Sequence, residues 1–247
     1  MNTIKSLVLF ALTVFAVGAC AQETIKEELA KKYPEVKIEK ITKTAYGNLF
    51  EVFAGGEIFY TDEKASFLLL GTLIDTQTRA NISEARLQKL TAIKFDDLPF
   101  ENAIKLVRGN GSRRIAIFAD PNCGYCKRFE QDVNSTDNLT AYIFAYPILA
   151  QDSINKSKSI WCSTDRLKAW QDQMLREKPP TAPGTCETPT DKVLALGRKL
   201  NITGTPTTFF EDGERISGAL PKERIEAKMV AAKLPLTVEA KNKFVAH

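Results

Sequence analysis

The chain has 247 residues, of which 44% are hydrophobic, so it can bury one large core or two small ones. Its formal net charge is +4, with lysine and glutamate interspersed, and nothing in this balance indicates a nucleic-acid partner. The only histidine is His247, the last residue. Ser–His and Cys–His nucleophile pairs and histidine-built zinc sites are therefore excluded.

Residues 1–21 are typical of a secretory signal peptide. "MNTIKS" carries one lysine, and the apolar run "LVLFALTVFAVGA" that follows is too short to span a bilayer comfortably. Ala19, Cys20 and Ala21 form a small-x-small cleavage site, so we expect cleavage near Ala21 and export of the mature chain. The alternatives are a retained membrane anchor and, because "VGAC" loosely fits a lipoprotein signal, a mature chain acylated at Cys20.

Four further cysteines are available for pairing, an even number that suggests disulfides in an exported protein: Cys123, Cys126, Cys162 and Cys186. A zinc site built on all four would need a second close pair. Cys162 and Cys186 stand 24 residues apart, so we predict no metal site and no cofactor.

Residues 22–78 predict a small cystatin-like domain with one helix and an antiparallel sheet. A helix over 23–33 ends before Pro34, and four strand-like runs follow: "VKIEKIT", "NLFEVFA", "EIFYT" and "FLLLGTLID". So small a sheet leaves an open edge, which a second copy of the chain or the rest of the same chain could cover. We expect this domain to form a homodimer.

Residues 79–108 predict a linker helix region. "NISEARLQKLTAIKF" carries a helical apolar stripe, and Asn81 or Ser83 could cap its start. The next stretch, "DDLPFENAIKLVRGNGS", is expected to be a second short helix closed by Gly109 and the Asn-Gly pair.

Strands and helices alternate over residues 109–247 in the order of an α/β domain. We therefore expect the whole chain to be α+β, with an α/β second half. "RRIAIFA" and "LTAYIFAYP" predict strands on either side of the helix "NCGYCKRFEQDV". A helical insertion of about residues 150–200 follows. The hairpin "TTFFEDGERISG", which turns at Asp212-Gly213, and the helix "PKERIEAKMVAAK" complete the domain.

The pair Cys123 and Cys126 stands at the junction between a buried strand and a helix. With Asn122 as N-cap, Cys123 would be the first helical residue, where free N–H groups and the helix dipole favour a thiolate. Cys126 lies one turn deeper and can form a disulfide with Cys123, while Gly124 leaves room for a substrate backbone. We favour a redox dithiol over a structural cystine.

"FADPNCGYCKRF", "GTPTTFF" and the separated Cys162 and Cys186 resemble the DsbC family of periplasmic disulfide isomerases. The resemblance implies a thioredoxin fold with a helical insertion and a V-shaped homodimer with a shared apolar cleft. It also implies that Cys162 and Cys186 pair as a structural cystine, the alternative being a second redox pair.

The resemblance also assigns roles around the dithiol. Cys123 matches the attacking cysteine and Cys126 the resolving one. Thr205 and Pro206 match the threonine and cis-proline beside the dithiol, where, with Gly124 and Tyr125, they would contact the substrate; the alternative for Pro206 is an ordinary trans proline.

The implied function is isomerisation of wrong disulfides in misfolded exported proteins, with electrons from a membrane reductant of the DsbD type. Chaperone activity can accompany it. Two alternatives stay open: an oxidase or reductase of narrower range, like DsbG or DsbA, and a non-enzymatic holdase or metal carrier. Thioredoxin has a buried carboxylate where this chain has Ile117, and Asp120 is on a turn, so the residues identify no proton acceptor for Cys126.

Overall fold

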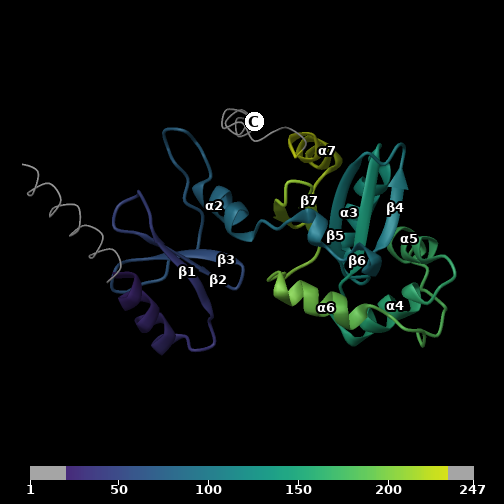
Figure 1. Ribbon diagram of the computed structural model, residues 1–247, viewed down its shortest axis with the longest axis horizontal. Helices are drawn as coiled ribbons and strands as arrows, with labels where there is room; N and C mark the ends of the chain where they lie inside the picture. Colours follow the sequence, from purple (N-terminus) through teal and green to yellow (C-terminus); the bar gives the residue numbers. More distant parts are fainter. Residues whose placement is uncertain (1–20, 233–247) are drawn as a thin grey trace, which may run out of the picture. The chain divides into compact units, whose positions relative to one another are not determined.

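The computed structural model describes residues 21–232, which divide into two compact units, one up to Leu87 and one from Gln88 onward (Figure 1). The predicted signal peptide, apart from Ala21, and Cys20 lie outside the described residues. Within residues 21–232, no helix is both long enough and apolar enough to cross a membrane.

The first unit is a helix packed on a three-stranded antiparallel sheet. Residues 21–32 are helical, and the strands, in the order β1-β2-β3, are β1 (Ile38–Lys43), β2 (Phe50–Ala54) and β3 (Glu57–Thr61). Gly55 and Gly56 join β2 to β3 with positive φ angles of 60° and 83°, as a tight hairpin requires. Helix and sheet bury one small core, made of Ile25, Leu29, Phe50, Val52 and Ala65.

The prediction of a fourth strand at "FLLLGTLID" is wrong. This segment makes only single bridges, Tyr60 with Leu69 and Ile74 with Asn81. Phe67, Leu68, Leu69 and Leu70 are all exposed, Leu70 by 80%. An apolar run forms a regular strand when it has a face to pack against, and the small core of this unit is already covered by its helix.

The predicted linker helix is present as α2 (Ile82–Thr91), and Asn81 caps it by accepting a hydrogen bond from Glu84 N–H at 2.9 Å. The second predicted helix is wrong. Two 3₁₀ turns, Phe95–Asp97 and Phe100–Asn102, are separated by Pro99, and a strand, β4 (Ile104–Arg108), follows. Proline interrupts the helix, and buried Ile104 and Leu106 alternate with exposed neighbours at the period of a strand.

The second unit is built on a five-stranded mixed sheet in the order β4-β6-β5-β7-β8. The central strand β5 (Arg113–Ala119) runs parallel to β6 (Leu139–Ala145) and antiparallel to β7 (Thr207–Phe210). Helix α3 (Gly124–Ser135) connects β5 to β6, and β8 (Arg215–Ser217) forms the predicted hairpin with β7. Gly213 is required in this hairpin because a Cβ there would lie 1.9 Å from Ile93 O.

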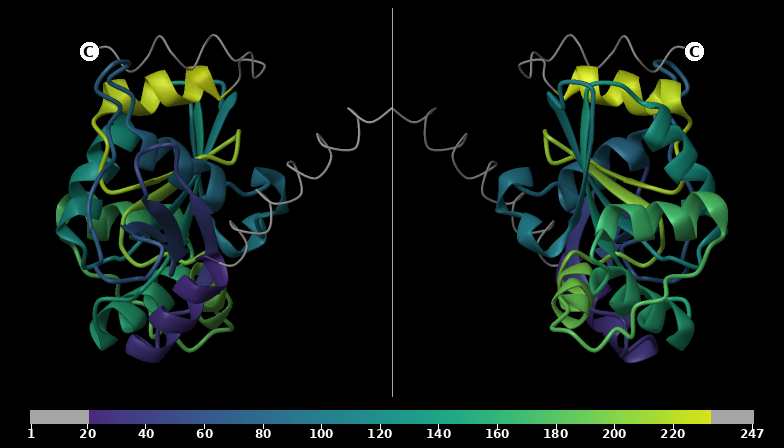
Figure 2. Two further views of the ribbon diagram at one scale, coloured as in Figure 1. Left: turned by 90° about the vertical axis from the view of Figure 1, so that its left-hand side faces the viewer. Right: turned by 90° about the vertical axis from the view of Figure 1, so that its right-hand side faces the viewer.

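Helices cover both faces of this sheet. On one face, α3, α5 (Arg166–Arg176) and α7 (Lys222–Ala231) enclose the larger core, which includes Cys126, Phe129 and Trp170. On the other, α6 (Thr190–Lys199) covers Phe118, Phe144 and Phe209; α7 (yellow) and α6 (light green) are accordingly far apart in both views of Figure 2. The predicted helical insertion of about residues 150–200 consists of α4 (Gln151–Trp161), α5 and α6.

Candidate functional site

The dithiol lies at the junction of β5 and α3. Cys123 is the N-cap of α3, and its Sγ accepts a hydrogen bond from Cys126 N–H at 3.2 Å. The prediction that Asn122 caps the helix and Cys123 is its first residue is therefore wrong by one residue. Asp120 Oδ1 accepts the Asn122 N–H at 2.8 Å, and this turn moves the start of the helix one residue along the chain.

Both cysteines are free thiols and both are shielded from solvent. Cys123 is 5% exposed and Cys126 2% exposed. Burial raises the pKa of the Cys126 thiol and contact with Cys123 adds to the rise, while the Thr205 side chain acts in the opposite direction. The two sulfurs therefore differ: Cys126 is held as a neutral thiol, and Cys123 receives an N–H donor at the start of a helix.

The segment before β7 reaches the dithiol from a distant part of the chain. The Thr205–Pro206 peptide bond is cis, and Thr205 O accepts a hydrogen bond from Cys123 Sγ at 3.3 Å. A Cβ on either Gly124 or Gly204 would meet no atom within 4 Å, so space is open beside both segments.

Tyr125 projects away from the protein beside this opening. Its side chain is 67% exposed, and the Arg128 guanidinium lies 5.7 Å from the centre of its ring. The structure therefore brings together all six residues predicted to react with or contact a substrate: Cys123, Gly124, Tyr125, Cys126, Thr205 and Pro206.

Sequence reasoning missed the part played by Asp120. Its side chain is fully buried, and it accepts hydrogen bonds from Asn122 N–H, Ser153 Oγ and Leu149 N–H. The "DPN" turn could have indicated the local bond to Asn122. The bonds to Ser153 and Leu149 join segments about 30 residues apart, and no local pattern predicts them.

A second buried carboxyl, that of Glu130, was also missed. It lies one turn after Cys126 on α3, and its Oε2 accepts a hydrogen bond from Trp170 Nε1 at 3.0 Å. Its Oε1 is buried without a hydrogen-bond partner. Burial raises the pKa of Glu130 to about 7, and the bond from Trp170 opposes this rise.

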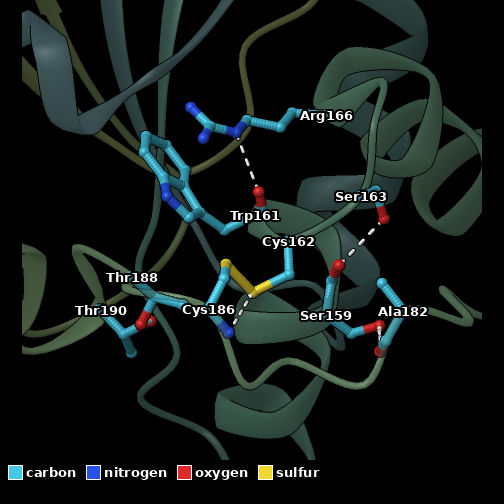
Figure 3. Close-up of a disulfide and its surroundings, with 9 residues drawn as sticks. All are labelled: Ser159, Trp161, Cys162, Ser163, Arg166, Ala182, Cys186, Thr188 and Thr190. Carbon is cyan, nitrogen blue, oxygen red and sulfur yellow. Dashed lines mark hydrogen bonds between the residues drawn. A yellow bond between two sulfur atoms is a disulfide. The ribbon is translucent and has the colours of Figure 1, made fainter.

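Cys162 and Cys186 form a disulfide with a Cα–Cα distance of 5.7 Å (Figure 3). The bond links the C-terminal end of α4 to the loop before α6. Arg166 stacks its guanidinium 3.8 Å from the centre of the Trp161 ring and donates to Trp161 O at 2.8 Å. Among the described residues, no group of three His, Cys, Asp or Glu side chains is placed to hold a metal ion.

A mixed sheet with a C-x-x-C pair at the start of the helix after its central strand, and a cis-proline facing that pair, defines a thioredoxin-fold dithiol protein. Comparison with known families agrees. Residues 100–233 match the thioredoxin-like domain, and residues 16–84 match the disulfide bond isomerase protein N-terminal domain.

Individual relatives identify the family. The chain is 45% identical over 208 residues to the probable thiol:disulfide interchange protein DsbC of Bordetella pertussis, covering 84% of this chain and 74% of that protein. It is 24% identical over 231 residues to DsbC of Escherichia coli K12, covering 90% and 94% respectively. The crystal structure of a disulfide interchange protein from Neisseria gonorrhoeae matches 56% of this chain and all of that one, at 36% identity and a TM-score of 0.54.

The chain belongs to the DsbC family of thiol:disulfide interchange proteins. The predicted resemblance and fold class are confirmed, and the chain is a thiol:disulfide oxidoreductase.

Proposed function

We propose that this protein is a periplasmic disulfide isomerase in which Cys123 attacks substrate disulfides and Cys126 resolves stalled intermediates. The observation that carries this proposal is the position of Cys123 Sγ. It lies at the start of α3, accepts the Cys126 N–H and contacts Thr205 O. This places the sulfur at the start of a helix and beside the segment that carries Pro206.

The reaction starts from the reduced protein. The Cys123 thiolate attacks one sulfur of a substrate disulfide, forming a mixed disulfide and releasing the other substrate sulfur as a thiolate. That thiolate then attacks another disulfide of the substrate. The reshuffling ends when a substrate thiolate displaces Cys123, which is released as a thiolate. No net oxidation or reduction occurs in this cycle.

When reshuffling stalls, Cys126 provides the exit. Its thiol loses a proton and attacks Cys123 Sγ, so the bond to the substrate breaks and the substrate leaves reduced. The protein is left with a Cys123–Cys126 disulfide and needs two electrons and two protons to return to its starting state. A membrane reductant of the DsbD type would supply the electrons.

The residues around the dithiol would hold an extended substrate. Gly124 leaves its backbone open to approach, Tyr125 offers an exposed ring, and Thr205 with Pro206 faces Cys123. Main-chain pairing with an extended peptide is a general way to bind substrates of many sequences.

The N-terminal unit would join two copies of the chain. The exposed residues Phe67, Leu68, Leu69 and Leu70 lie beside the edge strand β3, where a second copy could cover them. The predicted signal peptide of residues 1–21 supports a periplasmic location.

Refolding of a scrambled multi-disulfide protein tests the proposal. The wild-type protein should restore the native disulfides, and Cys123→Ala should reduce the rate to that of the buffer. A protein that is a monomer and mainly oxidised in cells would favour the narrower oxidase or reductase. Client binding without any Cys123-dependent refolding would favour a holdase.

A further inference from the structure

Two exposed apolar side chains lie in the loop between β6 and α4. Ile148 and Leu149, which we call the apolar lip, follow Pro147 and are 37% and 57% exposed. Neither belongs to a helix or strand, since β6 ends at Ala145 and α4 begins at Gln151. Large apolar side chains exposed together commonly mark a binding surface.

One buried carboxylate links the apolar lip to the turn that carries Cys123. Asp120 Oδ2 accepts the Leu149 N–H at 3.0 Å, and Asp120 Oδ1 accepts the Asn122 N–H at 2.8 Å. The residue just before Cys123 and the apolar lip are therefore held by the two oxygens of a single side chain. Ser153 Oγ donates to Oδ1 at 2.7 Å, which adds the first turn of α4 to the same arrangement.

The Asn122 side chain reinforces this connection. Its Nδ2 donates to Asp152 Oδ2 at 2.9 Å and to Ser153 Oγ at 3.0 Å, and its Oδ1 accepts from Lys156 Nζ at 2.7 Å. A loop held by so many bonds presents its apolar side chains in one arrangement. A ligand that binds it loses little free energy to ordering of the protein.

We propose that the apolar lip binds an apolar side chain beside the substrate cysteine that Cys123 attacks, and that Asp120 is the positioning residue for this contact. The inference rests on the proposed function. The occupant is the substrate chain because the Asp120 side chain holds the apolar lip next to the turn that carries Cys123. Cysteines are among the most buried residues of folded proteins, so a mispaired cysteine is exposed together with apolar neighbours.

The test uses two peptide disulfides, each made of two identical extended peptides, that differ only in a leucine or a serine next to the cysteine. The rate of disulfide exchange with the reduced full-length protein is measured for each. The wild type should react about tenfold faster with the leucine peptide, the effect of burying part of one leucine side chain.

The double substitution Ile148→Ser and Leu149→Ser should reduce this leucine preference to about one, because the serine side chains offer no apolar contact. Val107→Ser is the matched control, because Val107 is 50% exposed on β4. It should keep the full preference. An equal rate for both peptides with the wild type, or a preference kept by the double variant, would overturn the proposal. Failure of the wild type to react with either peptide would instead overturn the proposed function, and the inference with it.

Asp120→Asn tests the positioning role, because it replaces an acceptor oxygen by a donor without changing the exposed surface. We expect the leucine preference to fall at least threefold, with cooperative unfolding retained. A folded variant with the wild-type preference would show that Asp120 does not position the apolar lip. Should this variant fail to fold, Ser153→Ala, which removes one donor to the same carboxylate, takes its place and should lower the preference.

Discussion

The two cysteines of one helix turn have opposite surroundings. Cys126 is buried in the larger core, which raises the pKa of its thiol, whereas Cys123 accepts the Cys126 N–H and faces Thr205. This difference suits a pair in which one sulfur attacks the substrate and the other stays protonated until it resolves the mixed disulfide. The spacing of the cysteines predicted the pair, but the one-residue shift of the helix start depends on the bond from Asn122 to Asp120.

Glu130 provides a test of the buried surroundings of α3. Its pKa rises from 4.5 to about 7, so the folded state favours the protonated form. Below pH 4.5 the carboxyl is protonated in both states and does not affect stability. Between pH 4.5 and about 7 the unfolded chain releases this proton while the folded protein retains it, so the folded state loses up to about 3 kcal/mol of stability, and the loss is constant above pH 7.

Glu130→Gln should therefore match the wild type in urea unfolding at pH 4 and exceed its stability by up to about 3 kcal/mol at pH 8. Glutamine can still accept the Trp170 hydrogen bond. The control is Glu187→Gln at an exposed position, which removes one carboxyl without altering the buried surroundings of α3. A stability difference for Glu130→Gln that does not grow with pH would contradict the buried, raised-pKa assignment.

At the scale of elements, the disulfide joins the end of α4 to the loop before α6, and neither of its cysteines belongs to the dithiol. Replacing both Cys162 and Cys186 by serine should lower the free energy of unfolding by roughly 3 to 4 kcal/mol, the chain-entropy effect of a loop of this length. Denaturant unfolding measures this loss. The rate of peptide disulfide exchange at Cys123 should stay within a factor of two.

A reductant supplies the control for this variant, since it should destabilise the wild type and leave the double serine variant unchanged. Loss of isomerase activity without loss of stability would instead favour the alternative of a second redox pair.

The elements that could be predicted from the sequence are those whose pattern and packing agree. The buried strand at 113–119 and the hairpin at Asp212-Gly213 fit their local sequence, and both were predicted correctly. The errors have a common cause. "FLLLGTLID" has the composition of a strand but no core to pack against in its unit. The residues of β4 were assigned to one helix together with the segment before them, which Pro99 and a 3₁₀ turn interrupt.

The residues of the site were likewise predicted where a local sequence pattern marks them and missed where only distant contacts do. The C-x-x-C pair and the "GTP" motif predicted six residues that the fold brings together. Asp120, by contrast, accepts hydrogen bonds from Leu149 and Ser153, and Glu130 accepts one from Trp170. These donors come from other segments of the chain. Contacts of this kind depend on how the helices pack, and one sequence carries no local sign of them.

At the scale of the whole molecule, the described residues divide at Leu87, which falls within α2 and within the predicted linker region 79–108. The first unit leaves apolar side chains exposed beside β3, and we propose that a second copy of the chain covers them. Leu70→Asp should shift the protein from dimer to monomer in analytical ultracentrifugation, because a charge replaces the most exposed of these leucines.

Val107→Asp, on the other unit, should leave the assembly unchanged. A wild type that sediments as a monomer would refute self-association through the first unit, as would a folded Leu70→Asp variant that stays dimeric.

The central claim is that Cys123 attacks and Cys126 resolves, and trapping of the covalent intermediate tests it most directly. Reduced Cys126→Ala and Cys123→Ala variants are mixed with a disulfide-containing protein, quenched with acid and mapped by mass spectrometry. We predict that Cys126→Ala accumulates a mixed disulfide at Cys123, which a reductant reverses, and that Cys123→Ala accumulates none. A mixed disulfide at Cys126 in the Cys123→Ala variant, or no adduct at Cys123 in the other, would contradict the account.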